Sequence, residues 1–499
     1  MKVVTSEEML SIEQRAIASG VPLGTLIERA GRALSDVVAK SEGPVLILAG
    51  PGNNGADGET AARLLAESGR DVTLYTFRRQ PAAQVRTVQA ENDPELAMLA
   101  RILDSAAVIV DALLGTGQSR PVEGLLGGIV EAANAPSATR ARVAADVPTG
   151  VNADTGAISG AAFRADITVA MGYAKVGDMV WPGAGYAGRV IVADLQLPAP
   201  DHVALLAPEP ADIARLLPGR PRNSNKGTFG RTLVIGGSER FPGAPALTSL
   251  GALRIGTGLV QAAVPASIVP SVASHAMEVT FLPLPGEDGA LTTDGLPALV
   301  DALAGAGAVA VGPGLSLTSA TVSLVRDLLP HLSVRPALVD ADGLNALARI
   351  EGWWRQMRLP VLTPHPGEMS RLTGLSIEAI QSDRLGVATK FAAEWGSVVV
   401  LKGAGSIVAA SDGRAAVITT GGPNLATAGT GDVLSGIIGG LLAQGMDPWD
   451  AAVAGTYIHG AAGDRVAGAL GSAGTLAGDL LPEIPVVRRN LQERERTTG

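Results

Sequence analysis

The sequence of 499 residues contains no cysteine, so disulfides, thiol nucleophiles and cysteine-ligated metals are excluded. Aromatic residues make up only 3% of the chain, which favours close helix–sheet packing over large aromatic surfaces. The net charge is -9 and no run of basic residues occurs, so we expect no nucleic acid binding driven by phosphate neutralisation. No stretch of 18 apolar residues occurs, and the start of the chain lacks the apolar core of a signal peptide. We therefore expect a cytoplasmic protein that does not associate with a membrane.

Glycine is abundant, with 63 residues. The apolar residues of the chain follow a repeating α/β pattern. After helical spacing in residues 1–40, short apolar runs alternate with helix-length segments, as in an open, doubly wound α/β domain. The lack of apolar/polar alternation in these runs indicates strands buried on both faces of a parallel sheet. The first series of runs covers 45–49, 72–77, 107–110, 142–145, 166–169 and 190–195, and a second covers 232–237, 259–264, 308–314, 336–342, 360–368 and 397–406.

The length predicts two domains, because single hydrophobic cores stop growing well below this size. We place a Rossmann-like doubly wound domain at 1–200 and a second α/β domain at 223–485. Between them, the proline-rich segment 201–222 is expected to be a linker with one short helix near 211–217. The last residues, 486–499, form a charged tail that we expect to fray.

The stretch Gly421–Gly436 reads GGPNLATAGTGDVLSG and leads directly into a helical apolar pattern. A glycine-rich turn at a helix start directs backbone N–H groups at one point and suits phosphate oxygens. Asp432 in that turn has a chemical purpose if it removes a proton from a hydroxyl that attacks a phosphoryl group. The alternative is an ordinary acid in the first turn of a helix, where the dipole favours it.

The loop after the first strand, GPGNNGADG, formally matches the GxGxxG dinucleotide fingerprint. That fingerprint also needs an acid after the second strand to hold a ribose, and Arg78 and Arg79 follow it instead. A nicotinamide dehydrogenase is therefore disfavoured. Amides and acids at three successive strand ends, led by Asn54, Asp111 and Asp146, would converge on one crevice of a doubly wound sheet.

These motifs, with DALLGTG, DVPTG and the segment 166–183, resemble the epimerase domain of the NAD(P)H-hydrate repair enzymes over nearly all of residues 1–200. The resemblance implies that Asp146 is catalytic and moves protons while the R and S hydrates interconvert at ring carbon six. It implies a potassium ion held by Asn54, Asp111 and Thr149. The hydrated cofactor would be bound by Asn53, Asn54, Gly55, Ala56, Asp57, Gly115, Thr116, Gly117, Gln118, Ser119, Arg120, Pro121 and Asp146.

Two positions depart from that family. Thr149 stands where serine is common and keeps the hydroxyl. Ala56 stands where glycine is usual, and its methyl group would strain a tight loop that needs a positive φ.

In the second half, small-residue loops at five strand ends accompany Lys402 and the GTGD turn. Residues 205–485 resemble the ribokinase-like superfamily, and closely its NAD(P)H-hydrate dehydratase branch. The resemblance implies hydrate contacts at Ala244, Gly314, His365 and the catalytic Asp432, although one histidine alone is more often a satisfied loop residue. It implies magnesium held through water by Glu368, and nucleotide contacts at Lys402, Gly403, Ala404, Gly405, Ser406 and Gly431.

We therefore expect a two-domain repair enzyme, an epimerase followed by a dehydratase, that acts on NADH and NADPH hydrates. The family implies potassium, magnesium and ADP as the co-substrate, which is released as AMP and phosphate. We also expect a homo-oligomer. A ribokinase-type small-molecule kinase with a ligand-binding first domain is the alternative, and a noncatalytic scaffold is a third.

Overall fold

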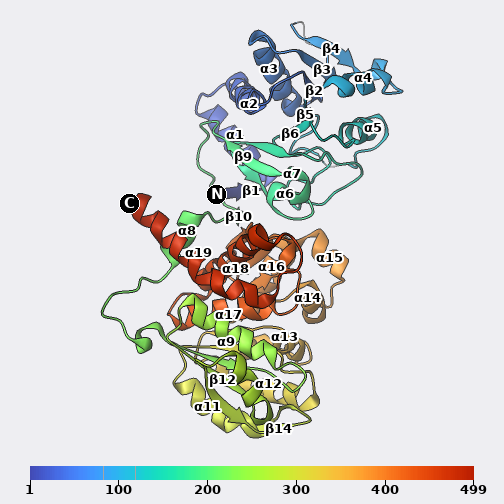
Figure 1. Cartoon of the computed structure of the whole chain (residues 1–499). Helices are drawn as coiled ribbons and strands as arrows, with labels where there is room; N and C mark the ends of the chain where they lie inside the picture. Colours follow the sequence, from blue (N-terminus) through green and yellow to red (C-terminus); the bar gives the residue numbers. More distant parts are fainter. Residues whose placement is uncertain (82–83, 119, 499) are drawn as a thin grey trace. The chain divides into compact units, whose positions relative to one another are not determined.

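The computed structural model describes residues 1–81, 84–118 and 120–498 and divides into two compact units, Met1–Leu206 and Ala207–Gly499 (Figure 1). No helix in the described part of the chain has the length and apolar character needed to cross a membrane.

The first unit is built on a seven-stranded sheet in which all neighbouring strands are parallel. The strand order reverses between β2 and β5, and in such sheets ligands bind at that switch point, beyond the carboxyl ends of the strands. The strands, in spatial order, are β4 (Arg86–Gln89), β3 (Val72–Thr76), β2 (Val45–Ala49), β5 (Val108–Ala112), β6 (Ala141–Ala145), β7 (Ile167–Met171) and β9 (Arg189–Ala193).

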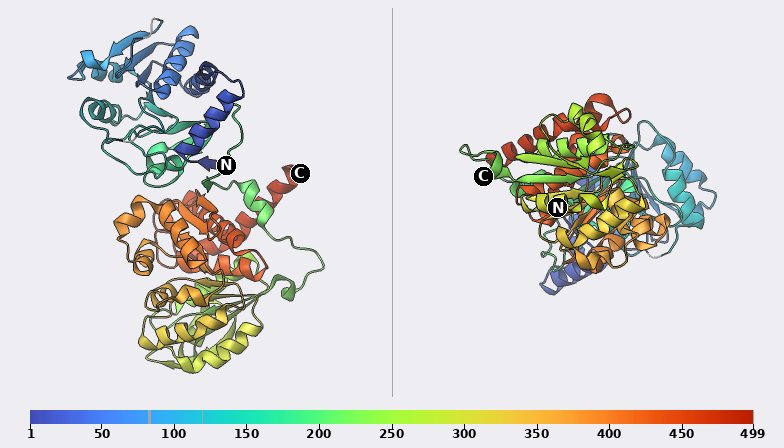
Figure 2. Two further views of the ribbon diagram at one scale, coloured as in Figure 1. Left: turned by 180° about the vertical axis from the view of Figure 1, so that it is seen from behind. Right: turned by 90° about the horizontal axis from the view of Figure 1, so that it is seen from below.

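Helices cover both faces of this sheet (Figure 2). Val45 and Ile47 of β2 pack against α2 (Leu23–Val38) and α3 (Asn53–Glu67), whereas Leu46 and Leu48 face α4 (Ala97–Ser105) and α5 (Gly124–Ala133). Burial on both faces explains why the apolar runs of the sequence do not alternate. The unit also contains α1 (Ser6–Ala18), α6 (Val176–Met179), α7 (Ala184–Ala187), and the short strands β1 (Lys2–Val4), β8 (Ala174–Lys175) and β10 (Leu205–Leu206).

The second unit has a nine-stranded sheet that is parallel up to β19 and ends in an antiparallel pair. The sequence predicts the parallel strands except β13, and it misses the antiparallel pair. The spatial order is β13 (Thr280–Leu284), β12 (Leu259–Pro265), β11 (Arg231–Ile235), β16 (Ala308–Val311), β17 (Ala337–Val339), β18 (Val361–Leu362), β19 (Val398–Leu401), β20 (Ser406–Ala410) and β21 (Ala415–Ile418).

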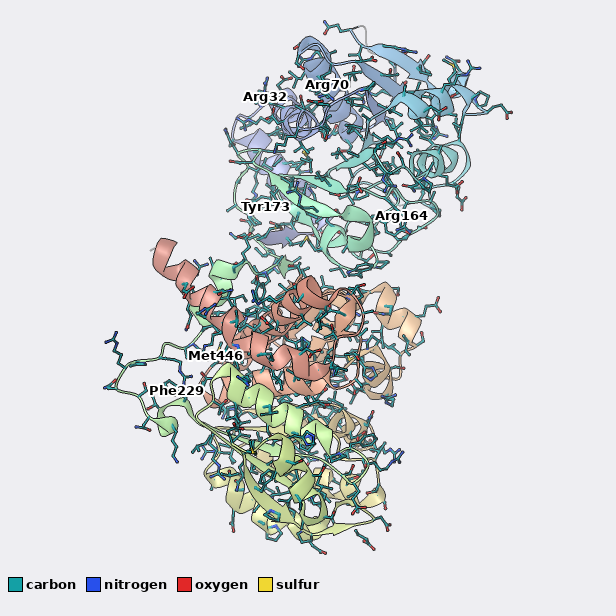
Figure 3. All side chains as sticks on the ribbon, viewed as in Figure 1. Arg32, Arg70, Arg164, Tyr173, Phe229 and Met446 are labelled. Carbon is teal, nitrogen blue, oxygen red and sulfur yellow. The ribbon has the colours of Figure 1, made fainter. Side chains whose placement is uncertain are left out.

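Buried apolar residues of α17 (Thr430–Ala443), α18 (Pro448–Leu470) and α19 (Ala477–Thr498) form one core cluster against this sheet. Met446 and Phe229, labelled in Figure 3, are both buried in this unit. The other helices of the unit are α8 (Pro210–Leu216), α9 (Gly243–Ile255), α10 (Val269–His275), α11 (Leu296–Ala304), α12 (Ser319–Leu332), α13 (Asp342–Leu347), α14 (Pro366–Thr373), α15 (Ile377–Ser382) and α16 (Arg384–Trp395).

The backbones of α17 and α9 lie in unusually close contact. A Cβ atom on Gly436 of α17 would lie 2.1 Å from the carbonyl oxygen of Thr248, and one on Gly251 of α9 would lie 2.7 Å from the carbonyl oxygen of Val433. No side chain fits at either point, so both glycines are needed for this approach.

Two segment predictions differ from the structure. The expected linker, 201–222, contains the predicted short helix as α8, with Ile213 buried, but it also contains β10, which was not predicted and which pairs with β1 through the buried Leu205. The expected tail, 486–499, is part of α19 up to Thr498. Val487 and Leu491 are spaced by one helical turn and both are buried, so the charged composition there belongs to an amphipathic helix.

Candidate active sites

In the first unit, the predicted residues gather at the carboxyl ends of β2, β5 and β6. Asn54 lies in the first turn of α3, and its amide Nδ2 donates to the carbonyl oxygen of Leu114, 2.6 Å away in the turn after β5. A Cβ atom on Gly115 would lie 3.4 Å from that of Asn54 and 3.6 Å from Oδ2 of Asp146. The three strand ends therefore meet, as the sequence predicts.

The segment Asn53–Asp57 is not a loop, as the sequence reading supposed, but the start of α3. Ala56 is helical and is not among the residues with positive φ, so the expected strain at its methyl group is wrong. Gly50 and Gly55 are needed for packing, because a Cβ atom on Gly50 would lie 1.7 Å from the carbonyl oxygen of Leu113 and one on Gly55 1.9 Å from that of Gly50.

The turn after β5 joins a neighbouring loop. The side-chain oxygen of Gln118 accepts a hydrogen bond of 2.8 Å from the backbone N–H of Gly150, next to Thr149. Arg120 and Pro121 are exposed, and Thr116 and Gly117 complete the turn. Ser119 lies outside the described residues.

The three predicted potassium ligands are adjacent and buried. Thr149 donates its hydroxyl to Oδ1 of Asp111 at 2.8 Å, and its backbone N–H donates to Oδ2 at 2.7 Å. Burial raises the pKa of Asp111 to about 6, although the hydrogen bonds from Thr149 and Leu113 oppose the shift. Oδ1 of Asn54 is buried and has no hydrogen-bond partner, which leaves an oxygen free for a cation.

Asp146 is held by a lysine that the sequence reading did not single out. The ammonium group of Lys175, whose side chain is fully buried, donates to Oδ1 of Asp146 and to the carbonyl oxygen of Met171 at 3.1 Å. Asp146 itself has a φ of 67°, a left-handed conformation that aspartate tolerates better than most residues. In the sequence, the one feature that points to Lys175 as a partner of a buried acid is its position among mainly apolar residues after β7.

Carboxyl groups surround this ion pair. Burial, with smaller contributions from the charges of Asp146 and Glu13, raises the pKa of Asp57 to about 8 against the opposing charge of Lys175. Burial likewise raises the pKa of Asp178 to about 7. Asp57 lies one turn after Asn54 on α3. Groups that can exchange protons therefore lie close to Asp146, the predicted catalytic residue.

In the second unit, Lys402 at the end of β19 is the centre of the site. Its ammonium group lies 2.6 Å from Oδ1 of Asp340 and 3.7 Å from Oε2 of Glu368. A Cβ atom on Gly431 would lie 3.6 Å from that same ammonium nitrogen. The loop predicted to bind the nucleotide and the GTGD turn are thus brought together around the ammonium group of Lys402. Gly403, Ala404 and Gly405 form the turn that follows β19, and Ser406 is the first residue of β20.

Asp432 lies in the first turn of α17, as predicted, and Gly429 with φ +88° precedes the helix. Burial raises the pKa of Asp432 to about 7, and the charge of Asp340 adds to the shift against the opposing charge of Lys402. A cavity of about 330 Å³ borders the segment immediately before this turn and includes Thr427 and Leu476 in its lining.

The remaining predicted contacts lie on the neighbouring strand ends. A Cβ atom on Gly314 would lie 2.9 Å from the Cβ of Ala244, which is at the start of α9. His365 caps α14: its Nδ1 accepts from the N–H groups of Gly367 and Glu368, while the Glu368 carboxylate accepts from the N–H of His365 at 2.8 Å. His365 therefore has a structural role whether or not it contacts a substrate.

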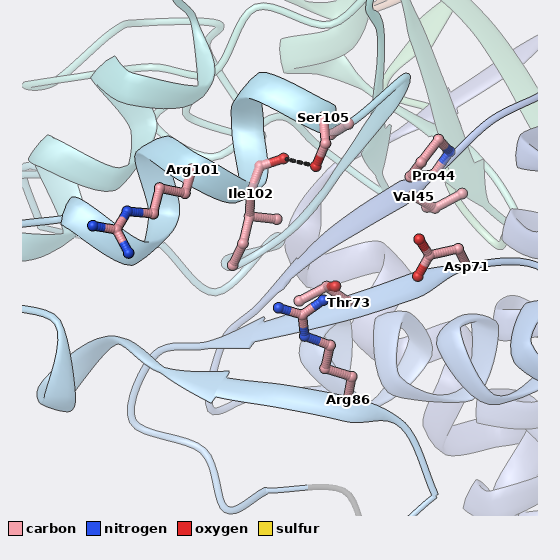
Figure 4. Close-up of a pocket in the computed structure, with 9 residues that line it drawn as sticks. Pro44, Val45, Asp71, Thr73, Arg86, Arg101, Ile102 and Ser105 are labelled. Carbon is pink, nitrogen blue, oxygen red and sulfur yellow. Dashed lines mark hydrogen bonds between the residues drawn. The ribbon is translucent and has the colours of Figure 1, made fainter.

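A second cavity, of about 110 Å³, lies at the opposite edge of the first unit (Figure 4). It is lined by Asp71 and Arg86 at the amino ends of β3 and β4 and by Arg101 of α4, and none of its lining residues is a predicted site residue. Ligands of doubly wound sheets bind at the carboxyl ends, so this cavity is not the candidate site.

The pKa of Asp432 predicts the pH dependence of any reaction in which it is the base. Only the ionised carboxylate accepts a proton, and a raised pKa means that ionisation is lost as the pH falls through about 7. We expect the rate of the chemical step to be constant above about pH 8 and to fall about tenfold per unit below about pH 6. Single-turnover rates between pH 5.5 and 8.5 test this, and a rate that is flat across the range contradicts it.

The sequence matches two family models, "YjeF-related protein N-terminus" over residues 23–177 and "NAD(P)H-hydrate dehydratase" over residues 232–486. The bifunctional NAD(P)H-hydrate repair enzyme Nnr of Moorella thermoacetica is 40% identical, with 100% of this chain and 98% of that protein covered. The protein of the same name from Thermofilum pendens is 37% identical over 99% of this chain and 97% of its own.

Among solved structures, a ribokinase-like superfamily protein from Enterococcus faecalis V583 matches with a TM-score of 0.51 and 23% identity, over 59% of this chain and 99% of that one. That likeness concerns the fold of the second unit and agrees with the ribokinase-like architecture expected there. With the two family matches and the full-length relatives, it leads to one conclusion: the chain belongs to the bifunctional NAD(P)H-hydrate repair enzymes, in which an epimerase domain precedes a dehydratase domain.

Proposed function

We propose that the second unit dehydrates the S form of NADH and NADPH hydrates with ADP as co-substrate, and that the first unit interconverts the R and S forms. The observation that carries the proposal is the placement of Asp432 in the amide-rich first turn of α17, beside the ammonium group of Lys402. Transfer of a phosphoryl group to a hydroxyl needs a base close to the site that binds the phosphate, and the start of a helix is such a site.

The chemistry follows from the leaving group. Hydroxide leaves poorly from the hydrated ring, so Asp432 takes the proton of that hydroxyl while its oxygen attacks the terminal phosphoryl group of ADP. The bond to the AMP oxygen breaks, and the amides of Gly429–Gly431 stabilise the developing charge. Phosphate then leaves with the carbon–oxygen electron pair, pushed by the ring nitrogen's electrons, and loss of a ring proton restores the dihydropyridine.

The remaining predicted contacts complete the dehydratase assignment. Lys402, Gly403, Ala404, Gly405, Ser406 and Gly431 would bind the nucleotide, while Ala244, Gly314 and His365 would contact the hydrate. The Glu368 carboxylate lies 3.7 Å from Lys402, and as an oxygen donor it suits magnesium held through water. The metal would supply charge neutralisation on the phosphates.

In the first unit, Asp146 would exchange protons with the hydroxyl at ring carbon six as the ring opens and closes. Its buried partner Lys175 keeps a cation beside the carboxylate. The segments Asn53–Asp57 and Gly115–Pro121 would bind the hydrate over the switch point of the sheet.

The potassium site is supported by the unpartnered Oδ1 of Asn54, the buried carboxylate of Asp111 and the hydroxyl of Thr149. Three oxygen donors suit a hard cation. Potassium held by these residues would screen the charge of Asp111 and stabilise the turn after β5, to which Asn54 is hydrogen-bonded.

A prediction follows for stability. Potassium at about 100 times its dissociation constant should stabilise the folded protein by about 2.7 kcal/mol, so the midpoint of thermal unfolding should rise when potassium chloride replaces choline chloride. Thr149→Val should abolish this rise, whereas Asp432→Asn, in the other unit, should keep it. Equal midpoints in both salts for the unaltered chain would exclude the site.

The function as a whole is tested by mixing a racemic hydrate with ADP or ATP and following the absorbance of the reduced nicotinamide. Complete recovery requires both activities. The alternative, a ribokinase-type kinase, would release a stable phosphorylated compound without recovering the absorbance. A cytoplasmic location and a homo-oligomeric state stay predictions of the sequence and its family.

A further inference from the structure

We propose that Asp340 is a positioning residue of the dehydratase reaction, which fixes Lys402 and the Asp432-bearing turn of α17 in a single geometry. The proposal rests on the proposed function of the second unit and assigns its carboxylate no direct contact with the substrate.

Asp340 follows β17 in the middle of the sheet and is 1% exposed. Its two oxygens are used by two different elements: Oδ1 lies 2.6 Å from the ammonium nitrogen of Lys402, and Oδ2 accepts a hydrogen bond of 2.6 Å from the hydroxyl of Ser435. Ser435 is on α17, three residues after Asp432. Residues three apart lie on the same face of a helix, so one carboxylate connects the nucleotide lysine with the face that carries the base.

The backbone around Asp340 is also fixed. A Cβ atom on Gly312 would lie 1.8 Å from the carbonyl oxygen of Asp340, so the end of β16 packs directly against it. The next residue, Ala341, has a φ of 50°, which costs free energy in a residue with a side chain. Such a conformation persists where the surrounding structure determines it, so the backbone on both sides of Asp340 is constrained.

The charge of Asp340 has a second effect. Four charged groups act on Asp432: Asp340, Asp342, Glu368 and the opposing Lys402. Burial contributes most to the raised pKa of Asp432, and the negative charge of Asp340 is the next cause. Removing this charge should therefore lower the pKa of the base, whereas removing only the Ser435 hydroxyl should not.

Asp340→Asn tests both effects. We expect kcat on the high-pH plateau to fall about 100-fold, because a small displacement of a catalytic group costs about that much. The acid limb of the pH profile should move to lower pH, and KM for ADP should rise because Lys402 loses its anchor. Ser435→Ala should lower kcat about tenfold, the value of a charge-assisted hydrogen bond, with the acid limb and KM for ADP unchanged.

Asp412→Asn is the matched control, since Asp412 is an exposed carboxylate of the same unit paired with Arg414. A purely structural role for Asp340 would lower the unfolding midpoint without moving the acid limb. If Asp340→Asn folds and matches Asp412→Asn within about twofold in kcat, KM and acid limb, the proposal is overturned. If it does not fold, Ser435→Ala decides, and an unchanged kcat there overturns the proposal.

Calorimetric titration with ADP separates this proposal from the function on which it rests. A chain that binds ADP but never restores reduced nicotinamide would refute the dehydratase assignment. Weaker ADP binding by Asp340→Asn than by Asp412→Asn would still support the anchoring of Lys402, and equal binding would refute it.

Discussion

Asp432→Asn is expected to lower the rate of hydrate dehydration by at least about 10³-fold, within the range assigned to a lost general base. Asparagine has nearly the same shape but cannot accept the hydroxyl proton. The substitution removes one negative charge from a cluster that contains Asp340, Asp342 and Glu368, so ADP should bind at least as tightly as before. Stopped-flow absorbance of the reduced nicotinamide measures turnover, and calorimetry measures ADP binding.

The control is Asp301→Asn, an exposed aspartate on α11 of the same unit, which should match the unaltered chain. If Asp432→Asn turned over within about tenfold of the unaltered rate, only about 1.4 kcal/mol of the barrier would depend on the carboxylate. Asp432 would then not be the base. A noncatalytic scaffold would show no biochemical change at all.

Asp146→Asn is expected to abolish epimerisation with a comparable loss of about 10³-fold. The left-handed backbone at φ 67° suits asparagine, and the side-chain oxygen can still accept from Lys175 and from the N–H of Met171 at 3.1 Å. The fold should therefore survive. With a racemic hydrate and excess ADP, recovery of reduced cofactor should stop once the S form is consumed.

Addition of a chain carrying Asp432→Asn should restore complete recovery, because that variant keeps its epimerase unit. Asp36→Asn, an exposed aspartate on α2, serves as the matched control and should recover both forms. Complete recovery by Asp146→Asn at the unaltered rate would remove Asp146 from the mechanism.

The positions of the candidate sites could be predicted because they depend on local chemistry. Glycine, amide and acid residues directly after apolar runs mark the carboxyl ends of parallel strands, and parallel strands bring those ends to one edge. Asn54, Asp111 and Asp146 around the switch point follow from this rule, whereas Asp432 follows from the glycine-rich turn that begins α17 and Thr149 from the family resemblance.

The partners that hold the reactive groups could not be predicted in this way. Lys402 and Asp340 are 62 residues apart, and Ser435 and Asp340 are 95 residues apart, so no spacing in the sequence links them. Lys175 reaches Asp146 only because β8 returns near the end of β6 after the long segment between them. Whether residues 53–57 are loop or helix depended on packing, since Gly55 would place a Cβ 1.9 Å from the carbonyl oxygen of Gly50.

The division between the two units falls inside the predicted linker 201–222, but the ordered structure within 201–222 and 486–499 was underestimated for a different reason. Prolines and charges suggested irregular structure in 201–222 and 486–499, but a few apolar residues in each segment are buried by distant elements. Tertiary burial outweighs local composition in such cases.

The close contact between the backbones of α17 and α9 at Gly436 and Gly251 limits which substitutions this protein can accept during evolution. One added methyl group at either glycine would force the two helices apart and displace Asp432, although neither glycine is among the candidate site residues. We therefore expect variation that adapts the enzyme to other hydroxylated substrates to fall in the loops at the strand ends and not at this helix contact. Random mutagenesis with selection for activity should recover substitutions in those loops and almost none at Gly436 or Gly251.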